Sequence, residues 1–344
     1  MIAGMVAEMK MRKSYLPNKP LQSIYFGGGT PSVLEKEDLI NIFKGIKENF
    51  SLAQDAEITL EANPDDLTEE KLKMLAETPI NRLSIGVQSF NDDDLKMMNR
   101  SHNAAQATQS IQQAQALGFS NITLDLIYGL PDRNEVHWEQ QLYKALDLNV
   151  PHISAYALTV EKETVLENWI RKGKISPLDE RIAERNFYFL IKILQKHGYE
   201  HYEVSNFAKK GYRAKHNSSY WQGKPYLGIG PSAHSFNGNS RQWNVSNNHV
   251  YLDSINQGEL HCEKETLSIA EQYNEKVMTG LRQKEGLDLE QIDLLFGVHY
   301  TQFLLKEAQA QLENGSLEQV GTHLVIPTPQ RFRSDGIAAA LFYI

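Results

Sequence analysis

Short apolar runs alternate with longer amphipathic segments through the first two thirds of the chain. The apolar runs are rich in the β-branched and aromatic residues that favour strands, and they cover residues 23–26, 57–61, 82–87, 121–128 and 152–158. Between them, apolar residues recur with the helical period at residues 36–49, 68–77, 104–117 and 135–146. This succession predicts an α/β fold whose parallel sheet has right-handed crossovers, and residues 202–207 predict one further strand.

The C-terminal part of the chain has a different pattern. Helices are predicted at residues 270–281, 288–296 and 302–314, followed by a hairpin at residues 317–327 and a last helix at residues 334–341. This order is typical of a winged-helix module. We therefore predict two domains, a sheet-containing domain at residues 1–264 and a mainly helical, winged-helix-like domain at residues 265–344.

Two further segments complete the pattern. Residues 1–15 predict a helix, because apolar side chains recur on one of its faces. Residues 209–241 predict a long loop rich in Gly, Ser, Asn and His, with aromatic residues interspersed. Such a loop is more often functional than a linker.

The composition is that of an ordinary globular protein, with 41% hydrophobic and 23% charged residues among 344. The longest apolar run, residues 337–344, is far shorter than the roughly 20 residues that a membrane helix needs. Charged side chains interrupt the N-terminal apolar positions, so we expect no secretory signal and no integral membrane protein. A net charge of −8 disfavours nucleic acids and anionic membranes as partners. We expect a cytoplasmic protein that acts on a small molecule.

Cysteine usage excludes several kinds of site. Cys262 is the single cysteine of the sequence. One thiol makes neither an intramolecular disulfide nor a zinc or iron–sulfur site that needs several thiolates.

Polar residues follow nearly every predicted strand, where the ligand-binding rim of a β/α barrel lies. Three glycines, residues 27–29, allow close approach of a ligand and offer free N–H groups for a carboxylate or phosphate, although a tight turn is an equal alternative. Glu61 points inward by strand alternation, and its alternative partner is Arg82 in an ion pair.

Asp125 is harder to explain structurally, because a carboxylate inside an apolar strand is costly unless it is hydrogen-bonded. We therefore favour a functional role for it. Gln88 and Arg100 would add an amide and a guanidinium to the same rim, although Arg100 fits a surface position equally well. Glu61 and Asp125 together would also suit an acid/base pair acting on a small substrate.

Five strings occur along the chain in a recognisable order. They are IYFGGGTPS (24–32), ITLEANPDDLT (58–68), NRLSIGVQSF (81–90), ITLDLIYGLP (122–131) and YEVSNFA (202–208). These strings resemble the radical S-adenosylmethionine family of oxygen-independent coproporphyrinogen III oxidases, and the resemblance covers almost the whole chain. A sixth string, HNSSYW (216–221), matches the HNxxYW signature of the haem-chaperone branch of that family, where it is associated with haem binding.

The resemblance implies a partial (β/α)6-type barrel that holds a [4Fe–4S] cluster on a CxxxCxxC loop after its first strand, with S-adenosylmethionine on the open iron. By position, the S-adenosylmethionine site would comprise seven residues: Gly28, Gly29, Thr30, Glu61, Gln88, Arg100 and Asp125. In the oxidase branch, the equivalents of the last three line a second cofactor site with those of Thr159 and His234.

The sequence departs from the family pattern in one respect, since it has no CxxxCxxC. Residues 1–15 correspond to the helix that follows the cluster loop, so the first barrel strand and the loop are missing. We expect a gene start placed too late or a deliberately shortened chain, because the other rim residues are in place. The cluster is then expected only in a full-length form, and residues 23–26 are expected to form an exposed sheet edge.

The resemblance implies a haem-binding chaperone that delivers haem to acceptor proteins, with those of the respiratory chain as candidates. His216 is the first candidate ligand, followed by Tyr220 and His234. Tyr220 and Trp221 are expected to offer a flat aromatic surface to the porphyrin, and Asn217 to orient the imidazole. The alternative is that HNSSYW is structural, with Trp221 packed against the barrel and hydrogen bonds of His216 tying the loop. The alternative activity is oxidative decarboxylation of coproporphyrinogen III.

Overall fold

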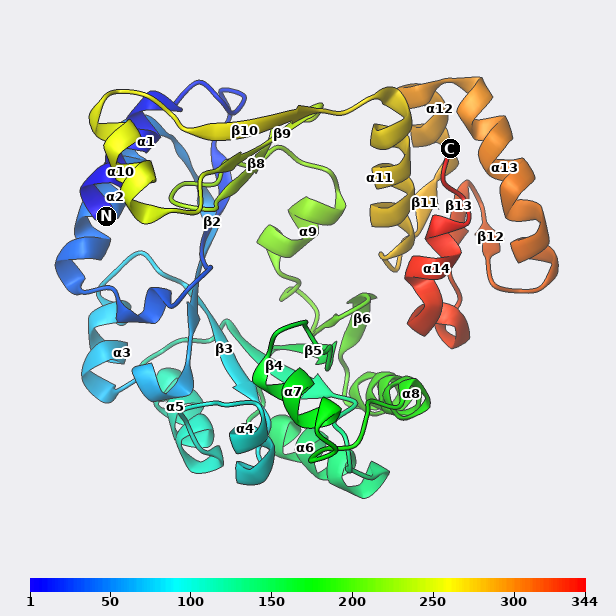
Figure 1. Ribbon diagram of the computed structural model, residues 1–344, viewed down its shortest axis with the longest axis horizontal. Helices are drawn as coiled ribbons and strands as arrows, with labels where there is room; N and C mark the ends of the chain where they lie inside the picture. Colours follow the sequence, from blue (N-terminus) through cyan, green and yellow to red (C-terminus); the bar gives the residue numbers. More distant parts are fainter. The chain divides into compact units, whose positions relative to one another are not determined.

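The computed structural model describes residues 1–344, and its largest sheet has seven strands in the order β1-β2-β3-β4-β5-β7-β6 (Figure 1). The strands are β1 (Leu21–Phe26), β2 (Leu52–Ala62), β3 (Arg82–Gln88), β4 (Ile122–Tyr128), β5 (His152–Ala157), β6 (Glu200–Glu203) and β7 (Asn206–Ala208). Strands β2 to β5 are parallel, whereas β7 is antiparallel to both of its neighbours. The predicted α/β fold is confirmed, and β1 forms one edge of the sheet as expected.

The predicted single strand at residues 202–207 is wrong. Two short antiparallel strands, β6 and β7, occupy this region, and Glu203 pairs with Asn206 across a two-residue turn. The turn consists of Val204 and Ser205. These residues lack the Gly, Asn or Asp that usually marks a tight hairpin, so the sequence gives no sign of the break.

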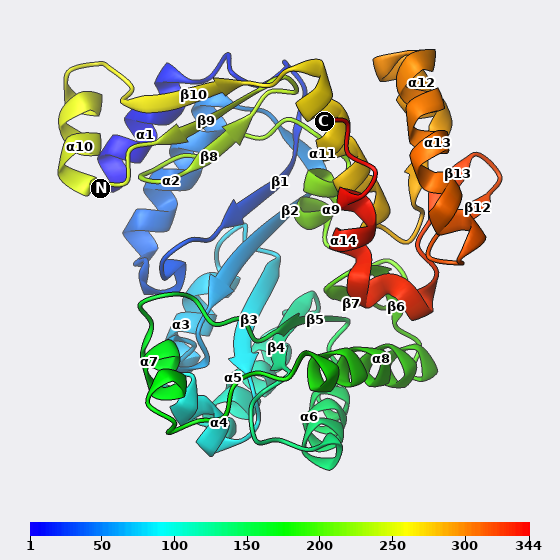
Figure 2. The same ribbon diagram turned by 45° about the vertical axis from the view of Figure 1, so that its right-hand side comes forward.

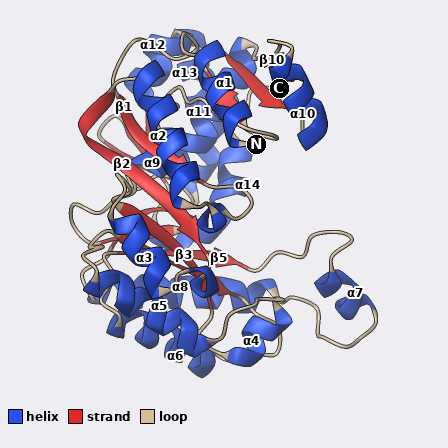
Figure 3. Cartoon of the chain, turned by 90° about the vertical axis from the view of Figure 1, so that its left-hand side faces the viewer, coloured by secondary structure: helices blue, strands red, loops and turns tan.

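The strands and helices divide between two compact units, each made of separate chain segments. One unit comprises Tyr25–Val33 and Glu57–Arg213. Its helices are η1 (Pro31–Val33), η2 (Pro64–Asp66), α3 (Glu69–Ala76), α4 (Asp92–Met97), α5 (Ala104–Ala116), α6 (Glu135–Asp147), α7 (Val165–Arg171) and α8 (Glu180–Lys196). Helices α3, α5 and α6 lie along one side of the strands of this unit (Figure 3).

Alternation along the strands explains which face these helices cover. Leu83 and Ile85 of β3 and Leu124 of β4 have no exposed surface. They point toward the helices because successive side chains of a strand face opposite sides. The intervening residues Ser84 and Asp125 therefore point to the other face of the sheet, which is polar.

The other unit comprises Met1–Ile24, Leu34–Ala56 and Ala214–Ile344. The elements of this unit that begin before residue 265 are α1 (Ile2–Met11), α2 (Lys36–Asn49), α9 (Lys215–Trp221), β8 (His234–Phe236), β9 (Ser240–Asn244), α10 (Asn248–Asn256) and β10 (Cys262–Thr266). Strands β8, β9 and β10 form an antiparallel sheet. The predicted long loop at residues 209–241 is therefore wrong in part, because it contains α9 and β8.

A buried carboxylate connects α1 to that antiparallel sheet. Glu8 has no exposed surface and accepts hydrogen bonds from Tyr251 Oη at 2.7 Å, Asn244 Nδ2 at 2.8 Å and the Gly230 amide at 2.8 Å. Arg12 pairs with it at 3.2 Å. The charge is fully compensated, as burial requires.

The C-terminal residues have a hydrophobic core of their own, which includes Tyr273, Leu304 and Leu324. The elements are α11 (Ile269–Leu281), β11 (Leu287–Asp288), α12 (Leu289–Phe296), α13 (Val298–Glu313), β12 (Glu318–Val320), β13 (His323–Val325), η3 (Thr328–Arg333) and α14 (Ser334–Ala339). Three short strands in the order β11-β13-β12 accompany the helices, as the winged-helix pattern predicts. The domain boundary after residue 264 stays a prediction. None of the helices combines the length and apolar character needed to span a bilayer.

Candidate functional site

The turn after β1 leaves open space beside two of its glycines. Gly28 and Gly29 have φ angles of +74° and +81°, a region that favours glycine. A Cβ at either position would meet no atom within 4 Å. Thr30 follows them and is exposed. The turn therefore has room for a ligand against its backbone.

Glu61 of β2 lies beside this turn. Its Oε1 accepts a hydrogen bond from Tyr25 Oη at 2.6 Å, and its Oε2 lies 3.4 Å from the Gly28 amide. Burial, together with the charge of Glu61, raises the pKa of Tyr25 well above its ordinary value. The phenol therefore stays protonated and remains a donor to the carboxylate.

The alternative ion pair between Glu61 and Arg82 is wrong. Arg82 instead lies 3.8 Å from Glu57 and donates to Asn121 at 2.7 Å. The parallel register explains this, because it places Arg82 opposite Thr59, two residues before Glu61. Glu61 is left facing the glycine turn.

Asp125 lies on the polar face of β4, where Ser84 of β3 donates to it at 3.3 Å. Burial raises the pKa of Asp125 to about 7; a hydrogen bond from Ser154 opposes the rise, and the charge of Glu61 adds to it. The expectation that this carboxylate is hydrogen-bonded is confirmed. The charge of Glu61 therefore influences the protonation of Asp125.

Gln88 and Arg100 both lie near the carboxyl ends of the strands. Arg100 is half-buried, and its Nη2 donates to Asn63 at 2.9 Å and lies 3.5 Å from the Gly86 carbonyl. These contacts hold the Arg100 guanidinium near the strand ends, while part of the side chain remains exposed. Gln88 has a φ of +65°, unusual for a residue with a side chain, where the β3–β4 register shifts.

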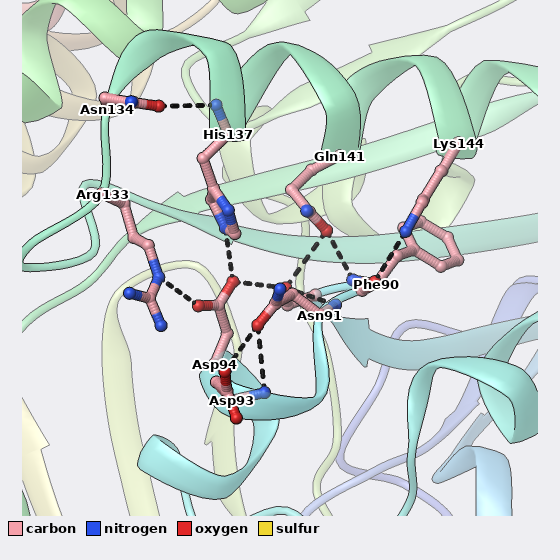
Figure 4. Close-up of polar contacts among 10 residues, drawn as sticks. Phe90, Asn91, Asp93, Asp94, Arg133, Asn134, His137, Gln141 and Lys144 are labelled. Carbon is pink, nitrogen blue, oxygen red and sulfur yellow. Dashed lines mark hydrogen bonds and ion pairs between the residues drawn. The ribbon is translucent and has the colours of Figure 1, made fainter.

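A buried network that the sequence analysis missed supports the segment after Gln88. Asp94 of α4 has no exposed surface and accepts hydrogen bonds from Arg133 Nε at 2.6 Å and Ser89 Oγ at 2.7 Å. His137 Nε2 lies 2.7 Å from the same carboxylate (Figure 4). The sequence predicts only a turn here, because two of the three partners of Asp94 lie about forty residues away along the chain.

The residues of this chain do not fit a [4Fe–4S] cluster. Cys262 is its only cysteine, and no group of three or more His, Cys, Asp and Glu side chains is placed to hold a metal ion. Such a cluster needs several thiolate ligands.

The HNSSYW string forms helix α9, and its histidine has a partner at each ring nitrogen. Helix α9 is labelled in the turned view of the ribbon (Figure 2). Nδ1 of His216 lies 3.1 Å from Oγ of Ser23 on β1, and Nε2 lies 3.2 Å from Oη of Tyr220. The Tyr220 ring meets the imidazole edge-on, at 4.9 Å between centroids. Burial lowers the pKa of His216 to about 4, so the ring is neutral at pH 7. Ser23 thus contacts Nδ1, and the orienting role expected of Asn217 stays a prediction.

Trp221 has different neighbours from His216 and Tyr220. The Arg282 guanidinium lies 5.1 Å from its ring centroid, and its carbonyl accepts a hydrogen bond from Gln283 at 3.1 Å. Trp221 thus packs against the C-terminal end of α11, in the predicted C-terminal domain, whereas the structural alternative expected it to pack against the barrel. The expectation that Tyr220 and Trp221 together offer an aromatic surface to the porphyrin stays a prediction.

The remaining predicted residues lie elsewhere. His234 begins β8, is exposed, and stacks on Trp243 at 6.1 Å between centroids. Thr159 is exposed just after β5. These two residues belong to different compact units, so the second cofactor site stays a prediction.

Comparisons with known proteins agree with this arrangement. Residues 6–142 match the Radical SAM superfamily, and residues 267–329 match the HemN C-terminal domain. Over 277 residues, covering 80% of this chain and 73% of the relative, the sequence is 39% identical to heme chaperone HemW of Lactococcus lactis subsp. lactis (strain IL1403). Over 336 residues, it is 31% identical to heme chaperone HemW of Mycobacterium tuberculosis (strain ATCC 25618 / H37Rv), covering 97% and 84% of the two chains.

The fold is similar to the solved structure of coproporphyrinogen III oxidase (HemN) from Escherichia coli, a radical SAM enzyme. The TM-score is 0.84 and the identity 21%, over 99% of this chain and 82% of the other.

Proposed function

Because this chain belongs to the HemW heme chaperone family, we propose that it binds haem through His216 and passes it to acceptor proteins. The proposed location is the cytoplasm, since an acidic protein has little affinity for anionic membranes or nucleic acids. The acceptor proteins are proposed to include respiratory-chain components.

The observation that carries the proposal is the state of the His216 ring. A neutral imidazole is a common axial ligand of haem iron, and a ligating histidine usually has its other ring nitrogen hydrogen-bonded. His216 is neutral at pH 7, and Ser23 holds its Nδ1. Tyr220 and His234 are the second and third candidate ligands. The oxidase alternative shares the fold, but HNSSYW favours the chaperone.

We propose the glycine turn and its surroundings as the S-adenosylmethionine site. The open backbone of Gly28 and Gly29, with Thr30, would meet the methionyl part, and Glu61 would contact the cofactor. Gln88, Arg100 and Asp125 would complete the wall. When bound, S-adenosylmethionine would supply a sulfonium group, and its methionyl part would carry free amino and carboxylate groups.

A hemin titration tests the haem proposal. We expect saturable binding with a shifted Soret band for the wild type, and loss of that shift for His216→Ala. His249→Ala removes an exposed histidine and is the matched control. Circular dichroism checks that each variant is folded. An unchanged Soret band in folded His216→Ala would exclude His216 as the ligand, and no binding by the wild type would contradict the haem proposal.

A further inference from the structure

Three side chains form a continuous hydrogen-bonded row: Ser23, His216 and Tyr220. The row runs from the edge strand β1 to helix α9, and all three residues belong to the same compact unit. His216 and Tyr220 are four residues apart, which places them on one face of α9. The imidazole therefore lies between two hydroxyl groups.

A neutral imidazole has one N–H and one lone pair, so the row has two possible proton arrangements. Either Nδ1 donates to Ser23 and Tyr220 donates to Nε2, or both bonds run the other way. A phenol is a stronger acid than an alkyl alcohol, so it is the better donor, while the serine oxygen is the better acceptor. The first arrangement is therefore favoured, with the proton on Nδ1 and the lone pair on Nε2.

Tyr220 then covers the nitrogen that would bind iron. Its hydroxyl lies 3.2 Å from Nε2. Its ring also meets the Tyr226 ring edge-on, at 4.6 Å between centroids. The Tyr220 side chain is 40% exposed, so it can swing into solvent when a ligand competes for Nε2. Ser23 is half-buried on β1 and stays in place.

We propose that Ser23 and Tyr220 together control the haem-binding nitrogen of His216. Ser23 fixes the proton on Nδ1 and so keeps the Nε2 lone pair available. Tyr220 masks that lone pair until haem iron displaces its hydroxyl. This inference rests on the proposed haem binding. The Ser23 hydroxyl favours binding of iron at Nε2, and the Tyr220 hydroxyl opposes it.

Substitutions of Ser23 and Tyr220 are expected to change hemin affinity in opposite directions, which a merely structural role would not produce. Ser23→Ala is expected to weaken hemin binding about 10- to 100-fold, the usual effect of removing a partner of a ligating histidine. Ser23→Thr keeps a hydroxyl and is expected to restore most of the affinity. Tyr220→Phe keeps the ring but not the hydroxyl, and it is expected to tighten binding roughly 3- to 10-fold, because a competing hydrogen bond is lost.

A measurement without haem decides the proton arrangement independently. Nitrogen NMR of the haem-free chain, labelled at histidine and assigned with His216→Ala, reports which ring nitrogen carries the proton. We expect the Nδ1–H form in the wild type and in Tyr220→Phe, and a partial shift toward Nε2–H in Ser23→Ala, where Tyr220 still donates to Nε2.

Each outcome supports or overturns one statement. An Nε2–H ring in the wild type overturns the inference even if hemin binds normally. Weaker binding by both Ser23→Ala and Tyr220→Phe overturns the masking role of Tyr220. If the wild type binds no hemin, the proposed function fails and this inference fails with it, while the NMR result still shows whether Ser23 sets the proton.

Discussion

Tyr25 Oη lies 2.6 Å from Oε1 of Glu61, so a phenol–carboxylate hydrogen bond connects β1 to β2. Hydrogen bonds to an ionised acceptor are shorter and stronger than neutral ones. The bond fixes the carboxylate beside the Gly28 amide and orients it toward the open turn. Any ligand of this turn therefore meets a negative charge in a defined position.

Binding of S-adenosylmethionine should depend on that charge. We expect the wild type to bind it more weakly than a cluster-bearing relative does, because the iron anchor is missing. Glu61→Ala should weaken binding a further tenfold or so, since one charge-assisted contact is lost. Tyr25→Phe should have a smaller effect, because the carboxylate remains.

Isothermal calorimetry gives the dissociation constants. Glu69→Ala, which removes an exposed carboxylate paired with Lys73, is the control and should change nothing. Wild-type affinity equal to that of a cluster-bearing relative would contradict this prediction.

Reconstitution with iron and sulfide should fail on this chain. After anaerobic treatment we expect substoichiometric iron and no cluster absorbance, because Cys262 is the only thiol. A cluster-bearing relative, treated in parallel, is the positive control. One stable cluster per chain would show that other side chains serve as ligands.

Asp125 should make the folded state less stable as pH rises. The folded pKa of about 7 lies above the ordinary value of 3.8. Between these values the folded chain holds a proton that the unfolded chain has released, so the free energy of unfolding falls as pH increases. Below pH 4 both states are protonated and the effect is absent.

Asp125→Asn should remove this contribution. Between pH 4 and pH 8, the free energy of unfolding of the variant should rise relative to that of the wild type by on the order of 2 kcal/mol, after allowance for solvent screening. Urea unfolding across this range measures the difference. Asp253→Asn, at an exposed position, is the control. Parallel pH profiles of wild type and Asp125→Asn would refute the prediction.

Asp94 should contribute far more stability than its neighbour Asp93. Asp94→Ala leaves Arg133 and His137 facing a cavity without their acceptor, at a cost of about 2 to 4 kcal/mol. Asp93 is 79% exposed and lies 4.0 Å from Lys96, so Asp93→Ala should change stability by less than about 0.5 kcal/mol. Urea denaturation followed by circular dichroism compares the two variants. Equal losses would rule out the network as the cause.

The strands and their polar ends could be predicted because each depends on local alternation. Asp125 interrupts an apolar run, and Glu61 follows the same two-residue period, so both could be placed on the inner face of the sheet. The family resemblance then supplied their proposed ligand, which local patterns do not specify.

The missed features depend on contacts between distant residues. Helix α9 is short and has no buried residue, so it shows no apolar period. Two of its contacts, with Ser23 and Arg282, involve residues far away in the chain. The pairing of Arg82 with Glu57 follows from the register of the strands, which cannot be predicted from local sequence patterns. The same holds for the Asp94 network.

The Glu8 cluster has a consequence for synthesis of the protein. Its partner Tyr251 follows 243 residues later in the chain. At ribosomal rates of 5 to 20 residues per second, α1 therefore waits roughly 10 to 50 seconds before its carboxylate can be buried. During that time α1 can pack against α2, the next α-helix of the chain, but Glu8 lacks its final hydrogen-bond partners. Burial of this carboxylate is therefore a late step of folding, which follows the synthesis of α10.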